Sequence, residues 1–428
     1  MRRYASFSWG WVQRAYRLND FRRLWLASVI SQFGTQVSFL AVPLAAIKIL
    51  NASPLQLGIL NALDFLPFAV VSLLAGVWID RLRKRPILIL ADLARAILLL
   101  GIPTAYFLGD LSLWLLYSVV FSVGIGTVFF DSASPAYLPS IVGRDKLVDA
   151  NAMLAMGGSS ARVIGPSIAG LAVQWLTAPV AVFADSLSYI ASAISLIRIQ
   201  SREIPVAPSS ETIRTSILSG LRFITHHTII RPLVIYSFAA NLAWSAVEAV
   251  FLIYASRNLG LSAGTIGVVF AVANIGLLVA SPLAKRINKW VGTGPSIVAG
   301  AAIHGLGIAL IPIAQLSLAA VFLALAGFVR SFGLILYHVN QESLRLAITP
   351  KEMRGRMYAS SRFMTWSAIP LGSLLGGFAG NQIGLTPILW MGAAVSVISV
   401  FALILSPVRS MKSLVDSGVH RRDRTIRK

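Results

Sequence analysis

Cysteine is absent from this 428-residue chain, and charged residues are scarce. Without Cys the chain can form neither disulfides nor thiolate metal sites. Only five His are present, none of them in an HExxH arrangement, so a zinc enzyme is not indicated. Asp, Glu, Lys and Arg make up 12% of the residues, about half of the ~25% that soluble domains carry. The chain therefore lacks the polar groups needed to cover a surface that faces water.

Motifs of nucleotide or hydrolytic chemistry are absent as well. The sequence contains no Walker motif and no nucleophile elbow. Their absence argues against transport driven by the chain's own ATP hydrolysis, and no feature favours the alternative of a membrane-embedded enzyme or scaffold. We expect a protein that is not an enzyme and that has no cofactor and no metal site.

Hydrophobic residues, in contrast, make up 56% of the chain and gather in long runs. Each run is close to the ~20 residues that cross the hydrocarbon core as a helix. The runs predict an all-α membrane protein with twelve transmembrane helices in two six-helix bundles. They lie at about 24–49, 54–79, 87–108, 112–131, 150–174, 179–198, 233–255, 262–283, 295–313, 318–340, 357–379 and 385–406.

Basic residues outnumber acidic residues by 37 to 16 and fall between the apolar runs. Alternate connections, beginning with the N-terminal segment, hold most of them, whereas the other connections hold little beyond Arg257 and Lys48. Basic connections mark the cytoplasmic side of a membrane protein. We therefore expect a multi-pass protein of the inner or plasma membrane, with both termini in the cytoplasm at the anionic inner leaflet. Nucleic acid is not an expected partner.

The longest connection divides the chain into two similar halves. It contains Pro205 and Pro208 and then an amphipathic stretch, which predicts a linker followed by an interfacial helix. VGRDKLVDANAM at 142–153 aligns with ITPKEMRGRMYA at 348–359, which indicates an internal duplication. The predicted parts are a basic and aromatic segment 1–23, a bundle 24–198, the linker 199–231, a second bundle 232–406 and a basic tail 407–428.

The stretch GVWIDRLRKRP, from Gly76 to Pro86, closes the second apolar run. A glycine lets one helix approach another closely. An acid at a helix end can accept hydrogen bonds from a facing helix N-terminus or from an arginine. The alternative is a helix end that merely carries interfacial charges. The residues of this motif are Gly76, Asp80, Arg81, Lys84 and Arg85.

On these residues the chain resembles the major facilitator superfamily over nearly its whole length. The DL-R pattern at 92–95 and RGR at 354–356 are most similar to the branch of macrolide efflux proteins and the enterobactin exporter. The resemblance implies that the Gly76–Arg85 motif latches the two halves on the cytoplasmic side. The chain departs from the pattern at Arg83, where a second glycine is usual.

A second motif, GGSSARVIGPSIAG at 157–170, resembles the fifth-helix motif of proton-coupled exporters. The resemblance implies a bend that seals one end of the transport pathway; ordinary close packing of membrane helices is the alternative. Its residues are Gly158, Gly165, Pro166 and Gly170. The fourth-helix arginine of drug exporters is missing, because Val120 occupies its place before Gly124 and Gly126, so the coupling scheme attached to that arginine does not carry over.

Five ionisable residues fall near the middle of predicted spans, where such groups are costly and mark function by default. Asp64 and Glu248 are our candidates for proton coupling, because a carboxylate there can gain and lose a proton. Arg162, Arg330 and His304, together with the aromatic residues Trp244 and Phe65, are candidates for a central substrate cavity. The alternative is structural pairing between helices. Asp92 and Arg95 lie three residues apart on one predicted helix, so we expect them to pair locally.

These patterns predict a secondary transporter that works by alternating access. We expect it to export a hydrophobic or amphipathic small molecule, drug-like or macrolide-like, by proton antiport, and to act as a monomer. The alternative is a dedicated exporter of a siderophore or another secreted metabolite. A cavity made positive by Arg162 and Arg330 would favour the anionic siderophore.

Overall fold

The computed structural model describes residues 18–71, 75, 78, 79, 82–201, 203, 213–315, 318–350 and 353–412. All regular elements within these ranges are helices. Gly76, Asp80 and Arg81 of the predicted latch lie outside the described residues. So do most of the predicted segment 1–23, much of the linker and most of the tail 407–428.

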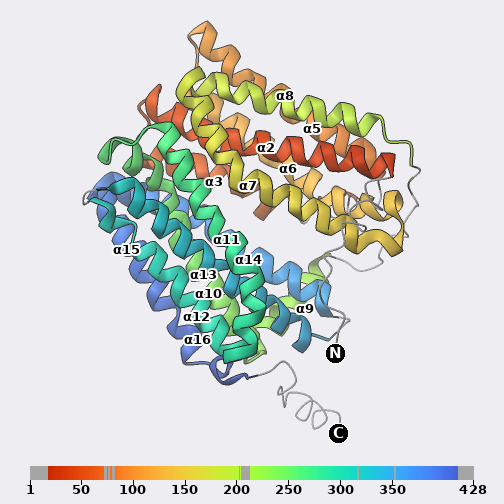
Figure 1. The fold of residues 1–428 in the computed structure, drawn as a ribbon, viewed down its shortest axis with the longest axis vertical. Coiled ribbons are helices and arrows are strands. Elements are labelled where there is room, and N and C mark those ends of the chain that lie inside the picture. The colour runs from red at the N-terminus through yellow and green to blue at the C-terminus, as the bar shows by residue number, and fades with distance from the viewer. Residues whose placement is uncertain are drawn as a thin grey trace. The chain divides into compact units, whose positions relative to one another are not determined.

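The described residues fall into two compact units (Figure 1). The first unit holds residues up to 45 and those between 70 and 209, and the second holds 46–69 and those from 210 onward. The helices of the first unit are α2 (Asn19–Lys48, whose last turn belongs to the second unit), α5 (Lys84–Leu108), α6 (Leu113–Val142), the 3-10 turn η1 (Arg144–Lys146), α7 (Leu147–Leu176) and α8 (Ala178–Ile197).

The second unit contains most of α3 (Pro54–Val70) and all the helices after the linker. These are α9 (Ile213–His226), α10 (Ile230–Ile253) with its π-helical continuation η2 (Tyr254–Asn258), α11 (Ala263–Val291), α12 (Thr293–Ala309), η3 (Pro312–Gln315), α13 (Ala319–Ile348), α14 (Arg354–Ile383), α15 (Leu385–Ser399), α16 (Phe401–Ile404) and η5 (Pro407–Ser410).

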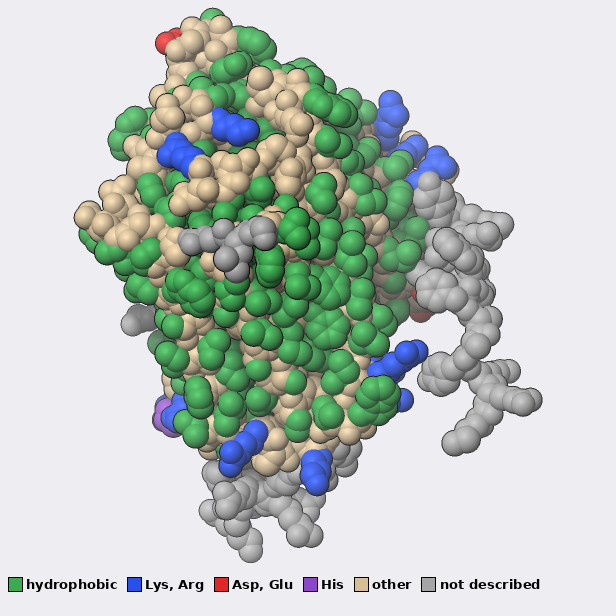
Figure 2. Space-filling view, turned by 60° about the vertical axis from the view of Figure 1, so that its left-hand side comes forward, with side chains coloured by type: hydrophobic (Ala, Val, Ile, Leu, Met, Phe, Trp, Pro, Cys, Tyr) green, Lys and Arg blue, Asp and Glu red, His purple; other side chains and the backbone are tan. Residues whose placement is uncertain are grey.

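Nine of the described helices are long and apolar enough to cross a membrane. The shorter apolar helix α3 and the 30-residue helices α7 and α14 coincide with the remaining predicted spans. The predicted fold class is therefore confirmed. Large apolar side chains cover the outside of these helices: Trp114 is 80% exposed and Ile97 70%. Figure 2 shows a face on which hydrophobic side chains dominate and Lys and Arg form only small groups.

Two helices extend well beyond the apolar runs that predicted them. The run ending near 131 becomes a helix that ends at Val142, and the run ending near 340 becomes a helix that ends at Ile348. Hydropathy marks where the hydrocarbon core ends, whereas the backbone hydrogen bonds continue into the interface beyond it. The extension places Arg345 inside α13, in its last turn.

The glycines of the predicted fifth-helix motif bring α7 against α2. A methyl group at Gly158 would lie 2.5 Å from Oε1 of Gln32, and one at Gly165 would lie 2.6 Å from Cβ of Gln36. Pro166 lies within the same continuous helix, and the four motif residues are buried. Small residues allow this close approach of two membrane helices. Close packing, the alternative considered from sequence, is what the first unit displays at this motif.

The second unit uses the same device at equivalent helices. A methyl group at Gly376 of α14 would lie 2.5 Å from Cα of Ala246 on α10. At Gly377 it would lie 2.8 Å from Cα of Gly58 on α3. The glycine-rich helix of each half therefore packs against the first long helix of that half, which agrees with an internal duplication.

Lys84 and Arg85, the described residues of the predicted latch, join helix ends within the first unit. Their backbone N–H groups donate to the Glu203 carboxylate at 2.6 and 2.7 Å. Nε of Arg85 donates to the carbonyl of Leu196 at 3.2 Å, near the C-terminus of α8. An acid thus lies at the N-terminus of α5 and a cation at the C-terminus of α8, which is the favourable placement for both helix dipoles.

We expect Gly165→Ala to lower the free energy of unfolding by about 1–3 kcal/mol, because the added methyl would overlap Gln36. Gly101→Ala is the matched control, since no atom lies within 4 Å of a methyl group there. Alanine favours a helix over glycine, so the control should be neutral or stabilising by up to about 1 kcal/mol. Thermal unfolding of the purified variants in detergent would show both effects, and equal stability of the two variants would refute the α2–α7 contact.

Candidate functional site

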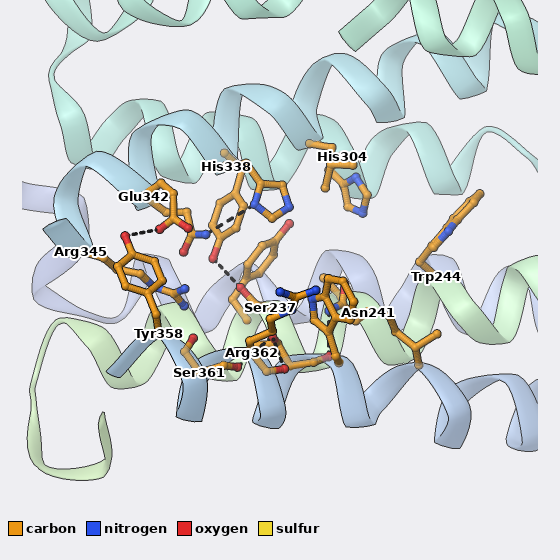
Figure 3. Close-up of a pocket in the computed structure, with 18 of the residues that line it drawn as sticks. Ser237, Asn241, Trp244, His304, His338, Glu342, Arg345, Tyr358, Ser361 and Arg362 are labelled. Carbon is orange, nitrogen blue, oxygen red and sulfur yellow. Dashed lines mark hydrogen bonds between the residues drawn. The ribbon is translucent and has the colours of Figure 1, made fainter. Parts of the chain in front are cut away.

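A cavity of about 810 Å³ lies within the second unit, between α10, α12, α13 and α14 (Figure 3). Its volume falls within the ~300–1,000 Å³ of small-molecule sites. Most of its wall is apolar or aromatic, with a few charged groups among them. The charged side chains on the wall are Arg330, Glu342, Arg345 and Arg362.

The residues that line the cavity recur at helical spacing along three helices. On α13 the lining residues Arg330, Leu334, Tyr337, Gln341 and Arg345 follow one another at intervals of three or four. Residues at this spacing share one face of a helix. Similar stripes run along α10 from Ser237 to Trp244 and along α14 from Tyr358 to Ile369.

Glycines at the crossing of α12 and α13 set the position of two lining residues. A methyl group at Gly300 would lie 2.5 Å from the backbone nitrogen of Tyr337, so the helices are in backbone contact. Nδ1 of His304 consequently lies 3.2 Å from the carbonyl oxygen of Arg330. The ring of His304 is 3% exposed and faces the cavity.

Trp244 and Arg330 form the end of the cavity wall that is nearest to the two predicted coupling carboxylates. The guanidinium carbon of Arg330 lies 3.8 Å from the centre of the Trp244 ring, a cation–π contact. The Trp244 indole N–H donates to the Glu248 carboxylate. Glu248 also interacts electrostatically with Arg330 and with Asp64. The structure therefore places Asp64, Glu248 and Arg330 in one electrostatic group.

A second arginine–tryptophan pair lies further along the cavity. The Arg362 guanidinium carbon is 4.1 Å from the centre of the Trp366 ring. Phe68 of α3 contacts the same ring at 5.4 Å between centroids, and Phe65 lies 6.4 Å from Phe68. Phe65 therefore belongs to the aromatic contacts behind this pair and does not line the cavity.

Three of the five residues predicted for a central cavity, Trp244, His304 and Arg330, line this one. Arg162 does not join them: it lies on α7 of the first unit with an exposed side chain. A cavity residue was expected there because Arg162 falls midway along an apolar run. Position along the run does not determine which way a side chain points, so a role of Arg162 at a substrate cavity stays a prediction.

Sequence reasoning missed most residues of the opposite end of the cavity. Figure 3 shows Glu342, Arg345, Tyr358 and Ser361 there, away from Trp244. Arg345 was overlooked because the predicted span stopped near 340. The three- and four-residue spacing from Arg330 to Arg345 is the signal that would have revealed it.

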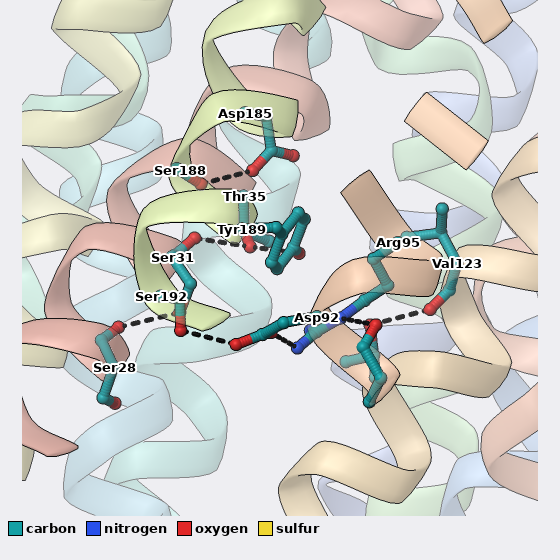
Figure 4. Close-up of polar contacts among 12 residues, drawn as sticks. Ser28, Ser31, Thr35, Asp92, Arg95, Val123, Asp185, Ser188, Tyr189 and Ser192 are labelled. Carbon is teal, nitrogen blue, oxygen red and sulfur yellow. Dashed lines mark hydrogen bonds and ion pairs between the residues drawn. The ribbon is translucent and has the colours of Figure 1, made fainter. Parts of the chain in front are cut away.

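The first unit contains a different polar cluster, around Asp92 and Arg95 of α5 (Figure 4). The two side chains form an ion pair and are 0% and 4% exposed. Ser192 donates to the second Asp92 oxygen at 2.5 Å. The Arg95 guanidinium carbon stacks on Phe130 at 4.7 Å and on Tyr189 at 4.2 Å. The local pairing expected for Asp92 and Arg95 is confirmed.

Gly126 and Asp185 complete the surroundings of this pair. A methyl group at Gly126 of α6 would lie 2.8 Å from Cγ of Arg95, so the glycine provides the space for the arginine. Asp185 of α8 is 1% exposed and accepts hydrogen bonds from Ser38 at 2.5 Å and from Ser188 at 3.1 Å. The cluster thus satisfies its buried charges with specific partners.

Comparison with known proteins identifies the family. The family model described as "Transmembrane secretion effector" matches residues 14–425. The chain belongs to this family of major facilitator superfamily transporters. It is therefore a multi-pass membrane transporter of small molecules and not an enzyme.

Two characterised relatives are similar over most of their length. The chain is 24% identical to the multidrug efflux pump Tap of Mycolicibacterium fortuitum, covering 90% of this chain and 95% of Tap. It is 26% identical to the enterobactin exporter EntS of Escherichia coli, covering 90% of this chain and 91% of EntS.

Solved structures share the fold. A bacterial homologue of the iron transporter ferroportin in its inward-facing state superposes with a TM-score of 0.71 at 16% identity, over 91% of this chain and 98% of that one. The nucleoside transporter NupG gives 0.73 at 11% identity, over 90% and 99%. At these identities the likeness shows the major facilitator fold alone.

We expect Asp92→Leu or Arg95→Met alone to lower the free energy of unfolding by about 3–5 kcal/mol, because each leaves one buried charge without its partner. The double variant Asp92→Leu/Arg95→Met removes both charges and should recover most of this loss. Denaturant unfolding in detergent would compare the three. Additive losses in the double variant would contradict the mutual dependence of the two charges.

Proposed function

We propose that this transporter exports a small amphipathic molecule by proton antiport with alternating access. It would act as a monomer in the plasma membrane, with both termini in the cytoplasm. The observation that carries the proposal is the group formed by Asp64, Glu248 and Arg330 beside the cavity. Export as the direction is supported by similarity to Tap and EntS.

The charges of this group support a single exchangeable proton. The Glu248 carboxylate interacts with the guanidinium of Arg330 and with a second carboxylate, that of Asp64. The net charge of the group is zero when one carboxylate carries a proton, and it is negative when neither does. Uncompensated charge within a membrane is costly, so the favoured protonation state depends on whether another cation or water enters the group.

A direct path connects the proton to the substrate. Glu248 contacts Trp244, Trp244 stacks on Arg330, and both Trp244 and Arg330 line the cavity. Protonation of Glu248 would remove its attraction for Arg330 and leave the guanidinium free to attract a substrate group. Binding would in turn alter the proton affinity of the carboxylates, since coupling between two sites is reciprocal.

Alternating access requires two carrier states that differ in free energy by an amount that ligands can reverse. Protons supplied from outside would stabilise one state, and substrate from the cytoplasm the other. The latch of Gly76, Asp80 and Arg81 remains a prediction, as does a bend at Pro166 that seals the pathway.

A dedicated exporter of an anionic metabolite such as a siderophore is the second candidate. The cavity wall carries three arginines and one glutamate, which favours an anion over the cationic drugs that many multidrug pumps carry. Arg330, Arg345 and Arg362 supply the positive charge of this wall.

The test uses inverted membrane vesicles with an acidic interior and a pH-sensitive dye. We expect dye recovery on addition of one class among macrolides, other cationic drugs and catecholate siderophores. Glu248→Gln should reduce the recovery rate about tenfold or more, because the glutamine cannot carry the exchanged proton. Asp64→Asn should weaken it as well. Asp110→Asn, an exposed loop position, is the control with unchanged recovery.

Unchanged recovery in the double variant Asp64→Asn/Glu248→Gln would remove both residues from proton coupling. Uptake of substrate without any dye recovery would refute proton antiport itself. The class that produces recovery decides between the drug and the metabolite exporter.

A further inference from the structure

We infer that the cavity end formed by Gln341, Arg345 and Ser361 binds the anionic group of an organic acid with a flat apolar body. We refer to these three residues as the Arg345 site. The inference rests on the proposed function, because it takes the bound acid to be the transported molecule.

Arg345 is a buried cation with open hydrogen-bonding capacity. Its residue is 5% exposed, and Nε and Nη2 find no hydrogen-bond partner among the described residues. A buried charge without a partner costs several kcal/mol. A guanidinium offers its N–H groups as a planar fork that fits two oxygens of one anion. An oxyanion in the cavity would supply the missing partner.

Two further polar groups of the cavity wall also lack a hydrogen-bond partner among the described residues. Oγ of Ser361, on a residue 2% exposed, and Oε1 of Gln341, on a residue 3% exposed, have no partner among the described residues. Both residues line the cavity with Arg345. The site therefore combines two guanidinium N–H donors, a hydroxyl and an amide oxygen. This set suits a carboxylate or phenolate that has a hydroxyl group beside it.

No acid that the structure describes forms an ion pair with Arg345. The nearest acid in sequence on the cavity wall, Glu342, accepts a hydrogen bond from the Tyr358 hydroxyl at 2.8 Å. Within the described ranges, ion pairs of 4 Å or less join Arg23 to Asp20 and Arg95 to Asp92, and both pairs lie in the first unit. Arg95 has a carboxylate partner in Asp92, whereas Arg345 has no carboxylate partner within the described ranges.

The remainder of the cavity suits a flat apolar body. Two tryptophan rings lie along it, each covered by a guanidinium: Trp244 with Arg330 and Trp366 with Arg362. Arginine and tryptophan planes both stack on aromatic rings. The three arginines together repel an organic cation of the same shape. The chemical class that fits is an aromatic carboxylic acid or a catechol-like acid.

The test compares three probes of one shape and different charge: 2-naphthoate, 2-naphthalenemethanol and 2-naphthylmethylamine. Binding is measured by calorimetry on the purified protein in nanodiscs of zwitterionic lipid, without any gradient. We expect naphthoate to bind and the amine not to bind. Arg345→Gln should weaken naphthoate binding by about 10- to 100-fold, as expected for loss of charged hydrogen bonds. Ser361→Ala should weaken it less.

Arg286→Gln is the matched control, because it removes one exposed arginine of α11 in the same unit, away from the cavity. Its affinity for naphthoate should equal that of the unmodified protein. Arg345→Lys keeps the charge without the fork and should retain the preference for naphthoate over the alcohol at lower affinity. Thermal unfolding of each variant separates loss of binding from loss of folding.

Equal binding of naphthoate and the alcohol would overturn the inference, as would unchanged affinity in a folded Arg345→Gln variant. Displacement of naphthoate by anionic lipid added to the nanodiscs would assign the site to lipid headgroups and overturn it too. Export is tested separately by the vesicle assay. Naphthoate bound through Arg345 without proton-coupled transport would refute the proposed function alone, and transport of cations without naphthoate binding would refute the Arg345 site alone.

Discussion

The cost of an unmatched charge away from water is the constraint on which this structure depends. In the first unit the constraint is fully met: Arg95 has a carboxylate, two aromatic faces and a glycine that makes room for it. In the second unit Arg330 and Arg362 are matched by tryptophan rings, whereas Nε and Nη2 of Arg345 have no hydrogen-bond partner among the residues that the structure describes. A charge that the protein leaves open is one that a mobile partner can complete.

Glycine-mediated contact makes this arrangement possible. Backbone contact between α12 and α13 aligns His304 with Arg330, and contact of α14 with α10 and α3 brings Trp366 beside Phe68. With larger residues at these crossings the helices would stand apart and the stacked pairs would lose their geometry. These glycines therefore act as spacers of fixed, minimal thickness between helices.

Hydropathy and charge distribution predicted the class of fold and the number of helices, because the bilayer imposes length and composition on every span. Trp244 and Arg330 could also be predicted as cavity residues, since an ionisable or aromatic residue in mid-span is conspicuous. Arg345 could not, because α13 continues past the hydrocarbon into a last turn that the apolar run does not encode. The direction in which the Arg162 side chain points depends on rotation about the axis of α7, which an apolar run does not encode either.

Hydrogen bonds to the carboxylates of Asp20 and Glu203 hold the chain that follows α8 within the first unit. Asp20 accepts from the backbone N–H of Gln200 and of Ser201, and Glu203 accepts from the start of α5. These carboxylate contacts keep residues beyond the end of α8 within the first unit, which continues to residue 209. A gene divided to co-express the halves as separate polypeptides should be cut beyond residue 209, because a cut at Ile197 would remove the contacts that join the starts of α2 and α5 to the end of α8.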